Sequence, residues 1–219
     1  MLLTFTFFGP SAAITSSDQA TTLLDLMMKG GIIMIPIVLL SLVTFYIFIE
    51  RMAYLRRTAA IENGLIPSVT GDIRNGKSND AMLRARNNQA SVGRILESGI
   101  EKLGKSQNEI ERNLETTTNL EITKMEKNTG YLGIIAGIAP MLGFIGTISG
   151  VIKIFYNISL ADNISIGIIA GGLYQKMICS GAGLIVGVLA YAAYHYIQMR
   201  IDRYTIRLQE SLIEFLKAV

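Results

Sequence analysis

The sequence predicts an all-α membrane protein with three transmembrane helices extended by long cytoplasmic helices. Three apolar runs indicate this class: residues 30–49, 131–152 and 164–197, of which the first two carry no charge. Each is long enough to cross a hydrocarbon core, which takes about 20 helical residues. The mean hydropathy of +0.41 is high for a soluble domain, and 219 residues suit one compact unit.

The basic residues around these runs predict the orientation of the chain. They follow the first span, precede the second and follow the third: Arg51, Arg56, Arg57, Lys124, Lys127, Arg200, Arg203 and Arg207. The connection 156–163 carries Asp162 and no basic residue, and the segment before Lys29 carries only Asp18 and Asp25. By the positive-inside rule, the N-terminus of this multi-pass membrane protein is expected to face out, and the region from Arg57 to Lys127 and the C-terminus are expected to face the cytoplasm.

The amino-terminal segment allows two interpretations. Met1–Ala13 combines a signal-like apolar core, Leu2–Phe8, with a cleavage-like S-A-A motif, but it lacks a basic start. We favour a retained outer-face extension over a cleaved signal. Residues Thr21–Lys29 are then expected to form an amphipathic helix at that interface.

The first span is expected to continue past the membrane and to end at Asn63 and Gly64, a typical helix stop. Pro67, Gly71 and Gly76 predict a short linker after it.

A further helix is expected to begin at Asn79 or Asp80, as the N-cap, and to end at Gly104. Its apolar stripe at helical spacing comprises Val92, Ile95, Leu96, Ile100 and Leu103. Ser106 and Glu109 form a capping-box motif that starts a polar helix, which is predicted to run without a breaker into the second span.

The charges of this polar helix are expected to form a solvated face with i,i+4 pairs, ion pairs between subunits being the alternative. They are Glu109, Glu111, Arg112, Glu115, Glu121, Lys124, Glu126 and Lys127.

The third run, at about 1.5 Å per residue, is roughly 50 Å long and must project beyond the bilayer. The predicted segments are an outer N-terminal segment at 1–28, the first span and its extension at 29–56, a cytoplasmic helical region at 57–128, the second span at 129–156, a periplasmic loop at 157–163, the third span at 164–198 and a cytoplasmic C-terminal helix at 199–219.

Glycines in the second span predict a tight helix bundle. The segment Ala139–Ile154 contains Pro140, one threonine, Thr147, and three spaced glycines, Gly143, Gly146 and Gly150. Glycine at this density lets neighbouring backbones approach closely. The threonine hydroxyl is therefore a candidate waypoint for an ion.

One face of the third span is small, polar and cationic. Its residues recur at steps of three or four: Gly172, Lys176, Ser180, Gly183, Gly187 and Tyr191. Such a face is costly against hydrocarbon and is expected to look inward. Lys176 is either a snorkelling side chain or a functional residue paired with another subunit, and we favour the pairing.

Thr147 and Ser180 are expected to lie at similar depth, because the hairpin between the two spans turns near their midpoint. Each hydroxyl taken alone would more often bond to its own i−4 carbonyl, but the pair on glycine-rich faces favours a shared polar pathway. No Asp or Glu occurs in any of the three runs. Hydroxyls do not titrate near neutral pH, so a proton-driven machine needs a partner helix that supplies the acid.

Other function classes find no support in the sequence. The pI of about 9.0 does not indicate nucleic-acid binding, because acids and bases alternate. No H-E-x-x-H, G-x-S-x-G or phosphate-cradling motif appears, so we expect no enzyme, no metal and no cofactor. His195 is interpreted as an interfacial residue among Tyr191, Tyr194 and Tyr196, and Cys179 as a small packing residue.

Two membrane motifs resemble those of the ExbB/TolQ/MotA proton-channel family. A-P-M-L-G-F-I-G-T-I-S-G-V-I at 139–152 is similar to its second-span signature, and K-M-I-C-S-G-A-G-L-I-V-G at 176–187 to its third-span signature. D-I-R-N-G-K-S-N-D-A-M and V-G-R-I-L-E-S-G-I, within 72–100, resemble its cytoplasmic domain. The resemblance covers 30–198, and three spans fit the ExbB/TolQ branch better than the four-span MotA branch.

The resemblance implies a homopentamer whose second and third spans line a pore. Two helices of an ExbD-like partner, each with a protonatable aspartate, would occupy that pore, and work would pass to a TonB-like protein. Thr147 falls on the family's pore threonine, and Ser180 falls where the family has a third-span threonine. Gln175 stands where many relatives carry a glutamate, and Lys176 where they carry a small residue. We expect Lys176 to pair with an acid on the partner or on a neighbouring subunit.

The leading interpretation is an ExbB-like subunit of a proton-driven inner-membrane motor that energises TonB-dependent outer-membrane transport. The ion-pathway candidates are Thr147, Ser180, Lys176 and Gln175, and the close-packing candidates are Gly143, Gly146, Gly150, Gly172, Gly183 and Gly187. A TolQ-like envelope-maintenance or gliding motor and a non-conducting scaffold remain as alternatives. The sequence does not choose between protons and sodium.

Overall fold

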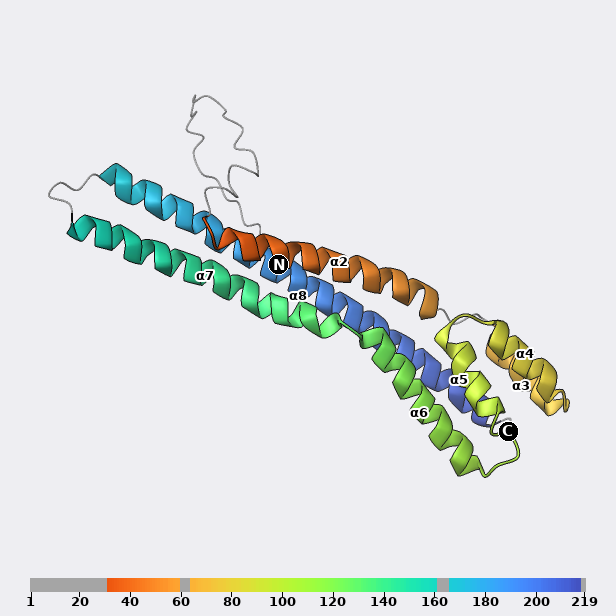
Figure 1. The fold of residues 1–219 in the computed structure, drawn as a ribbon. Helices are drawn as coiled ribbons and strands as arrows, with labels where there is room; N and C mark the ends of the chain where they lie inside the picture. The colour runs from red at the N-terminus through yellow and green to blue at the C-terminus, as the bar shows by residue number, and fades with distance from the viewer. Residues whose placement is uncertain (1–30, 60–63, 161–165, 218–219) are drawn as a thin grey trace, which may run out of the picture.

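The computed structural model describes residues 31–59, 64–160 and 166–217, and these residues form helices and turns without a strand. The helices are α2 (Met34–Thr58), α3 (Leu65–Arg74), α4 (Ser78–Asn87), α5 (Ser91–Ile100), α6 (Gln107–Glu126), α7 (Thr129–Ser159) and α8 (Ile166–Leu216) (Figure 1). The expectations for Met1–Ala13 and Thr21–Lys29 lie outside the described residues. The helix stop expected at Asn63 and Gly64 is wrong, because α2 already ends at Thr58.

Three helices are long and apolar enough to cross a membrane: α2, α6–α7 taken together, and α8. This confirms the expected all-α membrane fold. The longest, α8, contains 51 residues and is therefore roughly 77 Å long, well beyond the thickness of a bilayer. It leaves the apolar region and continues into a charge-rich bundle with α3, α4, α5 and α6 (Figure 1).

Within the apolar region, α7 and α8 form an antiparallel hairpin, and α2 lies along it (Figure 1). The hairpin extends past the start of α2 at the end away from the charge-rich bundle. The small core of this region consists of Ile37, Ile135, Ala139, Cys179, Val186 and Ala190. Many large apolar side chains around it stay exposed, as expected of helices that face lipid or other subunits.

The charge-rich bundle has a larger core, which ties the short helices to the end of α8. Val92, Ile95 and Leu96 of α5 pack there with Leu208 and Phe215 of α8, all fully buried or nearly so. This confirms the apolar stripe predicted for α5. The bundle is joined directly to the membrane hairpin, because α8 runs through both parts.

Several local expectations for this region are wrong. The linker predicted around Pro67 and Gly71 is helix α3, which begins after Gly64 (φ 118°) and ends before the turn at Gly76 (φ 73°). Pro67 is tolerated because it lies in the first turn, where its missing N–H costs no helical bond. The helix predicted from Asn79 or Asp80 to Gly104 is two helices, and α4 begins at Ser78 instead.

The polar helix does not run unbroken into the second span. Helix α6 begins after Ser106, as predicted, although the Ser106 side chain makes no capping hydrogen bond. The helix then ends at Glu126, and α7 restarts at Thr129. Between them Asn128 adopts a left-handed conformation (φ 65°), which asparagine tolerates better than most residues. The change of direction at this point is visible in Figure 1.

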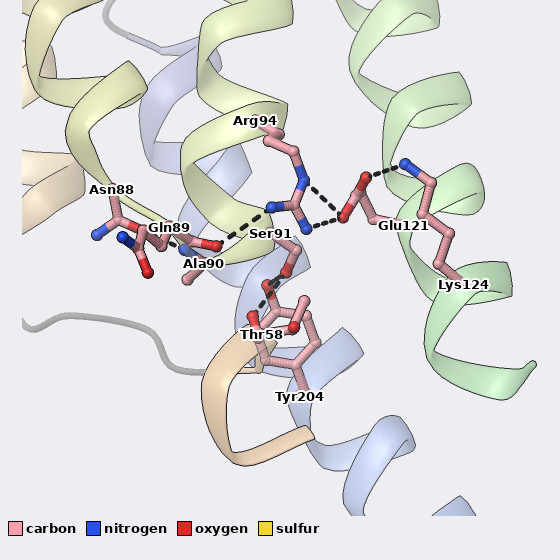
Figure 2. A network of polar contacts seen from close by, with 9 residues as sticks. All are labelled: Thr58, Asn88, Gln89, Ala90, Ser91, Arg94, Glu121, Lys124 and Tyr204. Atoms are coloured by element: carbon pink, nitrogen blue, oxygen red, sulfur yellow. Dashed lines mark hydrogen bonds and ion pairs between the residues drawn. The ribbon is translucent and has the colours of Figure 1, made fainter. Parts of the chain in front are cut away.

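A buried ion-pair network joins α5 to α6 (Figure 2). The Glu121 carboxylate, only 3% exposed, accepts hydrogen bonds from Arg94 and from Lys124, the latter at 2.7 Å. Glu121 was expected on a solvated face, and this is wrong for it alone among the acids of α6, because Glu109, Glu111, Glu115 and Glu126 are exposed. Burial by itself raises the pKa of the Glu121 carboxyl, but the two donors outweigh it and leave that pKa below its ordinary value.

Beside this network, three polar groups fix the end of α2 against α5 and α8 (Figure 2). The Ser91 hydroxyl donates to the Thr58 carbonyl at 3.0 Å and also contacts the Tyr204 hydroxyl. Since the single hydrogen of Ser91 is used on Thr58, Tyr204 is the donor to Ser91. Burial raises the pKa of the Tyr204 phenol, which keeps that proton in place.

The stability of the bundle should therefore decline in acid. Because the Glu121 pKa is lower in the folded protein, its contribution is present above the ordinary glutamate pKa of about 4.3 and is lost as the pH falls through the folded pKa. We expect Glu121→Gln to flatten the acid side of a plot of melting temperature against pH. Glu115→Gln, an exposed position on the same helix, serves as the control, and equal acid profiles for the two variants would contradict the assignment.

Candidate ion-pathway site

The site is built on the contact between α7 and α8, where glycines bring the two backbones together. A Cβ placed on Gly143 would lie 3.0 Å from the Ser180 Cα, and one on Gly183 would lie 2.5 Å from the Ala139 carbonyl oxygen. Both collisions are with backbone atoms, which no rotamer change can relieve. The two helices can therefore approach this closely only because both positions are glycine.

The same contact continues toward the turn of the hairpin. A Cβ on Gly146 would lie 2.8 Å from the Cys179 sulfur, one on Gly150 would overlap the Lys176 side chain, and one on Gly172 would lie 2.6 Å from Ile154 Cδ1. In the opposite direction, a Cβ on Gly187 would lie 2.5 Å from the Pro140 ring. All six glycines named from the sequence thus face the partner helix. The small face of α8 looks at α7 of the same chain.

Thr147 and Ser180 lie at similar depth in this hairpin, since their neighbours Gly146 and Cys179 contact each other. Each side chain is half-buried. The Thr147 hydroxyl donates to the Phe144 carbonyl at 2.6 Å, which is the local bond considered from the sequence, shifted from i−4 to i−3. The lone pairs of this hydroxyl oxygen can still accept a hydrogen bond from another donor. Among the described residues no hydrogen bond joins the two hydroxyls to each other.

Lys176 lies in an unusual place for a charged side chain. Its stem packs on Gly150, and its Nζ approaches Gly31 to within 3.7 Å of where a Cβ would be. Gly31 precedes the first residue of α2, so the ammonium lies level with the N-terminal end of the first span. No carboxylate pairs with it in the part of the chain that the structure describes. The side chain of Gln175 lies outside the described residues.

The described part of the site contains no acidic side chain and no cluster of metal ligands. His195 lies farther along α8, where its ring stacks edge-on against Tyr191 and Tyr194 with centroid distances of 4.3 Å and 5.2 Å. The arrangement offers hydroxyl oxygens and an ammonium along a close helix contact. The hydroxyls can pass or orient a proton, but they do not hold one as a charge near neutral pH.

Comparisons with known proteins bear on the same two helices. The family described as the MotA/TolQ/ExbB proton channel family matches residues 87–210, which include α5 to α7 and most of α8. The chain is similar to an ExbB homolog of biopolymer transport from Methanothermobacter thermautotrophicus, with 28% identity over 83% of this chain and 64% of that protein. It therefore spans somewhat less than two thirds of that relative.

The chain is also similar to two further relatives. A biopolymer transport protein of the ExbB-like type from Synechocystis is 26% identical over 92% of this chain and 77% of its own length. The Tol-Pal system protein TolQ from Haemophilus influenzae is 26% identical over 42% of this chain and 40% of its own length.

Proposed function

The chain belongs to the MotA/TolQ/ExbB proton channel family, and from this premise we propose that it is an ExbB-like subunit of a motor driven by the proton-motive force. In this proposal, copies of the chain form a sleeve, pentameric by family resemblance, in a bacterial inner membrane. The charge-rich bundle faces the cytoplasm. The sleeve surrounds an ExbD-like companion, and the work passes to a TonB-like protein that acts on outer-membrane transport.

The observation that carries the proposal is the pair of hydroxyls, Thr147 and Ser180, at one depth on the glycine contact of α7 and α8. A hydroxyl passes a proton by accepting one hydrogen bond while donating another, but it does not hold charge at neutral pH. The three spans supply no carboxylate of their own. The chain therefore suits the stationary half of a pathway whose titrating acid belongs to another polypeptide.

The test is proton flux into sealed vesicles that contain the full-length chain. An ExbD-like single-span protein with a membrane aspartate is co-reconstituted in one sample and omitted from the other. We expect a pH-sensitive dye in the lumen to report rapid gradient-driven flux only when both proteins are present. Rapid flux through the chain alone would refute the proposal, because the carboxylate would then be unnecessary.

The same assay also tests the pairing of Lys176. Its ammonium has no acidic partner among the described residues, so we propose that it pairs with a carboxylate of the companion or of a neighbouring copy. Charged groups at membrane depth are normally paired in this way. Lys176→Met should then lower both the flux and the amount of companion that copurifies. Unchanged flux and assembly would reject the pairing.

A TolQ-like envelope role is the second candidate, favoured by the match to a Tol-Pal system protein. Deletion of the gene separates the two. An ExbB-like subunit should be required for uptake through outer-membrane transporters, whereas a TolQ-like subunit should be required for envelope integrity.

A further inference from the structure

An apolar groove runs along the surface between α2 and α8. It has a volume of about 520 Å³, and its walls include Phe45, Phe48 and Met52 of α2 and Leu189 and Tyr196 of α8. Ala192 and Ala193 on α8 are too small to fill the space opposite the phenylalanines. The hydroxyl of Thr44, also in the wall, donates to the Leu40 carbonyl at 2.8 Å. The groove is therefore suited to a hydrocarbon chain.

The groove crosses the boundary of the apolar region. It begins at Thr44, inside the uncharged part of α2, and ends at Arg56, beyond the first charges Glu50 and Arg51. The twelve helical steps from Thr44 to Arg56 span about 18 Å along the helix axis. The inner part of the groove therefore lies at the depth of lipid tails, and the outer part at the depth of lipid headgroups.

A second, smaller pocket of about 230 Å³ adjoins the headgroup end of the groove. The two share Met52 and Arg56, and the second adds Arg200, Tyr204 and Arg207 from α8. Three arginines thus line one pocket at the end of an apolar groove. Arg200 also links the two spaces, since its guanidinium carbon lies 5.7 Å from the centroid of the Tyr196 ring.

None of these three arginines pairs with an acid among the described residues. Arg207 Nε donates only to the Arg203 carbonyl, at 3.3 Å. By contrast, Arg51 pairs with Glu50, and Arg94 pairs with Glu121. Unpaired guanidiniums that share one pocket attract an anion, and their fork geometry matches phosphate oxygens.

We propose that the groove and the arginine pocket form one site for an anionic phospholipid, with an acyl chain beside Phe45 and Phe48 and the phosphate between Arg56 and Arg200. One such molecule supplies both the apolar and the anionic part in the order that the site requires. Basic pockets between transmembrane helices bind anionic headgroups by the same chemistry. A helix from a second copy would bury the guanidiniums without a counter-charge unless it placed a carboxylate among them. The proposal does not depend on the motor function.

The experiment uses the purified full-length chain and counts bound lipid by native mass spectrometry. Phosphatidylglycerol, phosphatidylcholine and soluble glycerol phosphate are added in separate samples. The test variant R56Q/R200Q removes two arginines of the pocket. The matched control R57Q/R203Q makes the same change in charge on the same helices, at exposed residues that line neither space. We expect the wild type and the control to retain phosphatidylglycerol and the test variant to bind it at least about tenfold more weakly.

A second pair of variants separates the lipid from a free anion. Ala192→Phe fills the groove and leaves the arginines intact, while Val188→Phe adds the same ring to an exposed position of α8 outside the groove. Only Ala192→Phe should weaken the retention of phosphatidylglycerol. Equal binding of glycerol phosphate and lipid would overturn the proposal, as would equal losses in R56Q/R200Q and R57Q/R203Q. A change of oligomeric state in R56Q/R200Q, with lipid retention unaltered, would assign the groove to a second copy instead.

Discussion

Replacing Thr147 by valine is expected to lower gradient-driven flux at least about tenfold while the protein still folds and assembles. Valine keeps the shape of threonine but has no oxygen that can accept or pass a proton. Within the described chain, its hydroxyl bonds only to the Phe144 carbonyl of the same helix, and the loss of such a bond costs about 1 kcal/mol or less. A pathway that needs this oxygen should lose at least about tenfold in flux, which corresponds to about 1.4 kcal/mol in the barrier.

Two controls make the Thr147 result specific. Thr147→Ser retains the hydroxyl and should retain most of the flux. Thr116→Val removes a similar local bond, from Thr116 to the Arg112 carbonyl at 2.8 Å, on the exposed surface of α6, and should change nothing. Flux is measured in vesicles that contain the companion, and assembly is measured by mass photometry. Wild-type flux in an assembled Thr147→Val protein would favour the scaffold interpretation.

The membrane part of the fold could be predicted from the sequence because its signals are long and redundant. Two uncharged runs of about 20 residues and a longer run that contains Lys176 identify the three spans without any knowledge of packing. The spacing of Gly143, Gly146 and Gly150 predicted close helix packing but not that the neighbour is α8, which these glycines contact. The hairpin geometry predicted the similar depth of Thr147 and Ser180. The depth of Lys176 was harder to predict, because it depends on where α2 begins beside the hairpin.

The charge-rich bundle was less predictable because its signals are short and compete with one another. Pro67 and Gly71 are typical of a linker, yet burial of Ile66 and Val69 stabilises a helix around them. The sequence around Asn128 predicts a helix break no more strongly than the other asparagines of the chain do. Glu121 was placed on the solvated face by its charge, although it continues the spacing of the buried residues Ile110, Leu114, Thr118 and Met125. That spacing is the signal that could have revealed the ion pair with Arg94.

Gly183→Ala is expected to separate the hairpin helices, with a loss of stability that Gly181→Ala does not cause. The added Cβ would lie 2.5 Å from the Ala139 carbonyl oxygen and 3.0 Å from the Gly143 Cα. These atoms belong to the backbone of α7, so the helices must move apart along the whole contact. Overpacking of this kind costs about 3 kcal/mol, the upper end of the usual range, since no side chain can yield.

The control is Gly181, on the same helix and two residues away, where a Cβ would meet no atom within 4 Å in the described chain. Both variants gain the same helix propensity, about 1 kcal/mol, so their difference isolates the contact with α7. We expect the melting temperature of Gly183→Ala in detergent to fall below that of Gly181→Ala by roughly 5–10 °C. Flux should fall as well, because separating the helices moves Ser180 away from the depth-matched Thr147. Equal melting temperatures would mean that the close α7–α8 contact is not what holds the two hydroxyls in place.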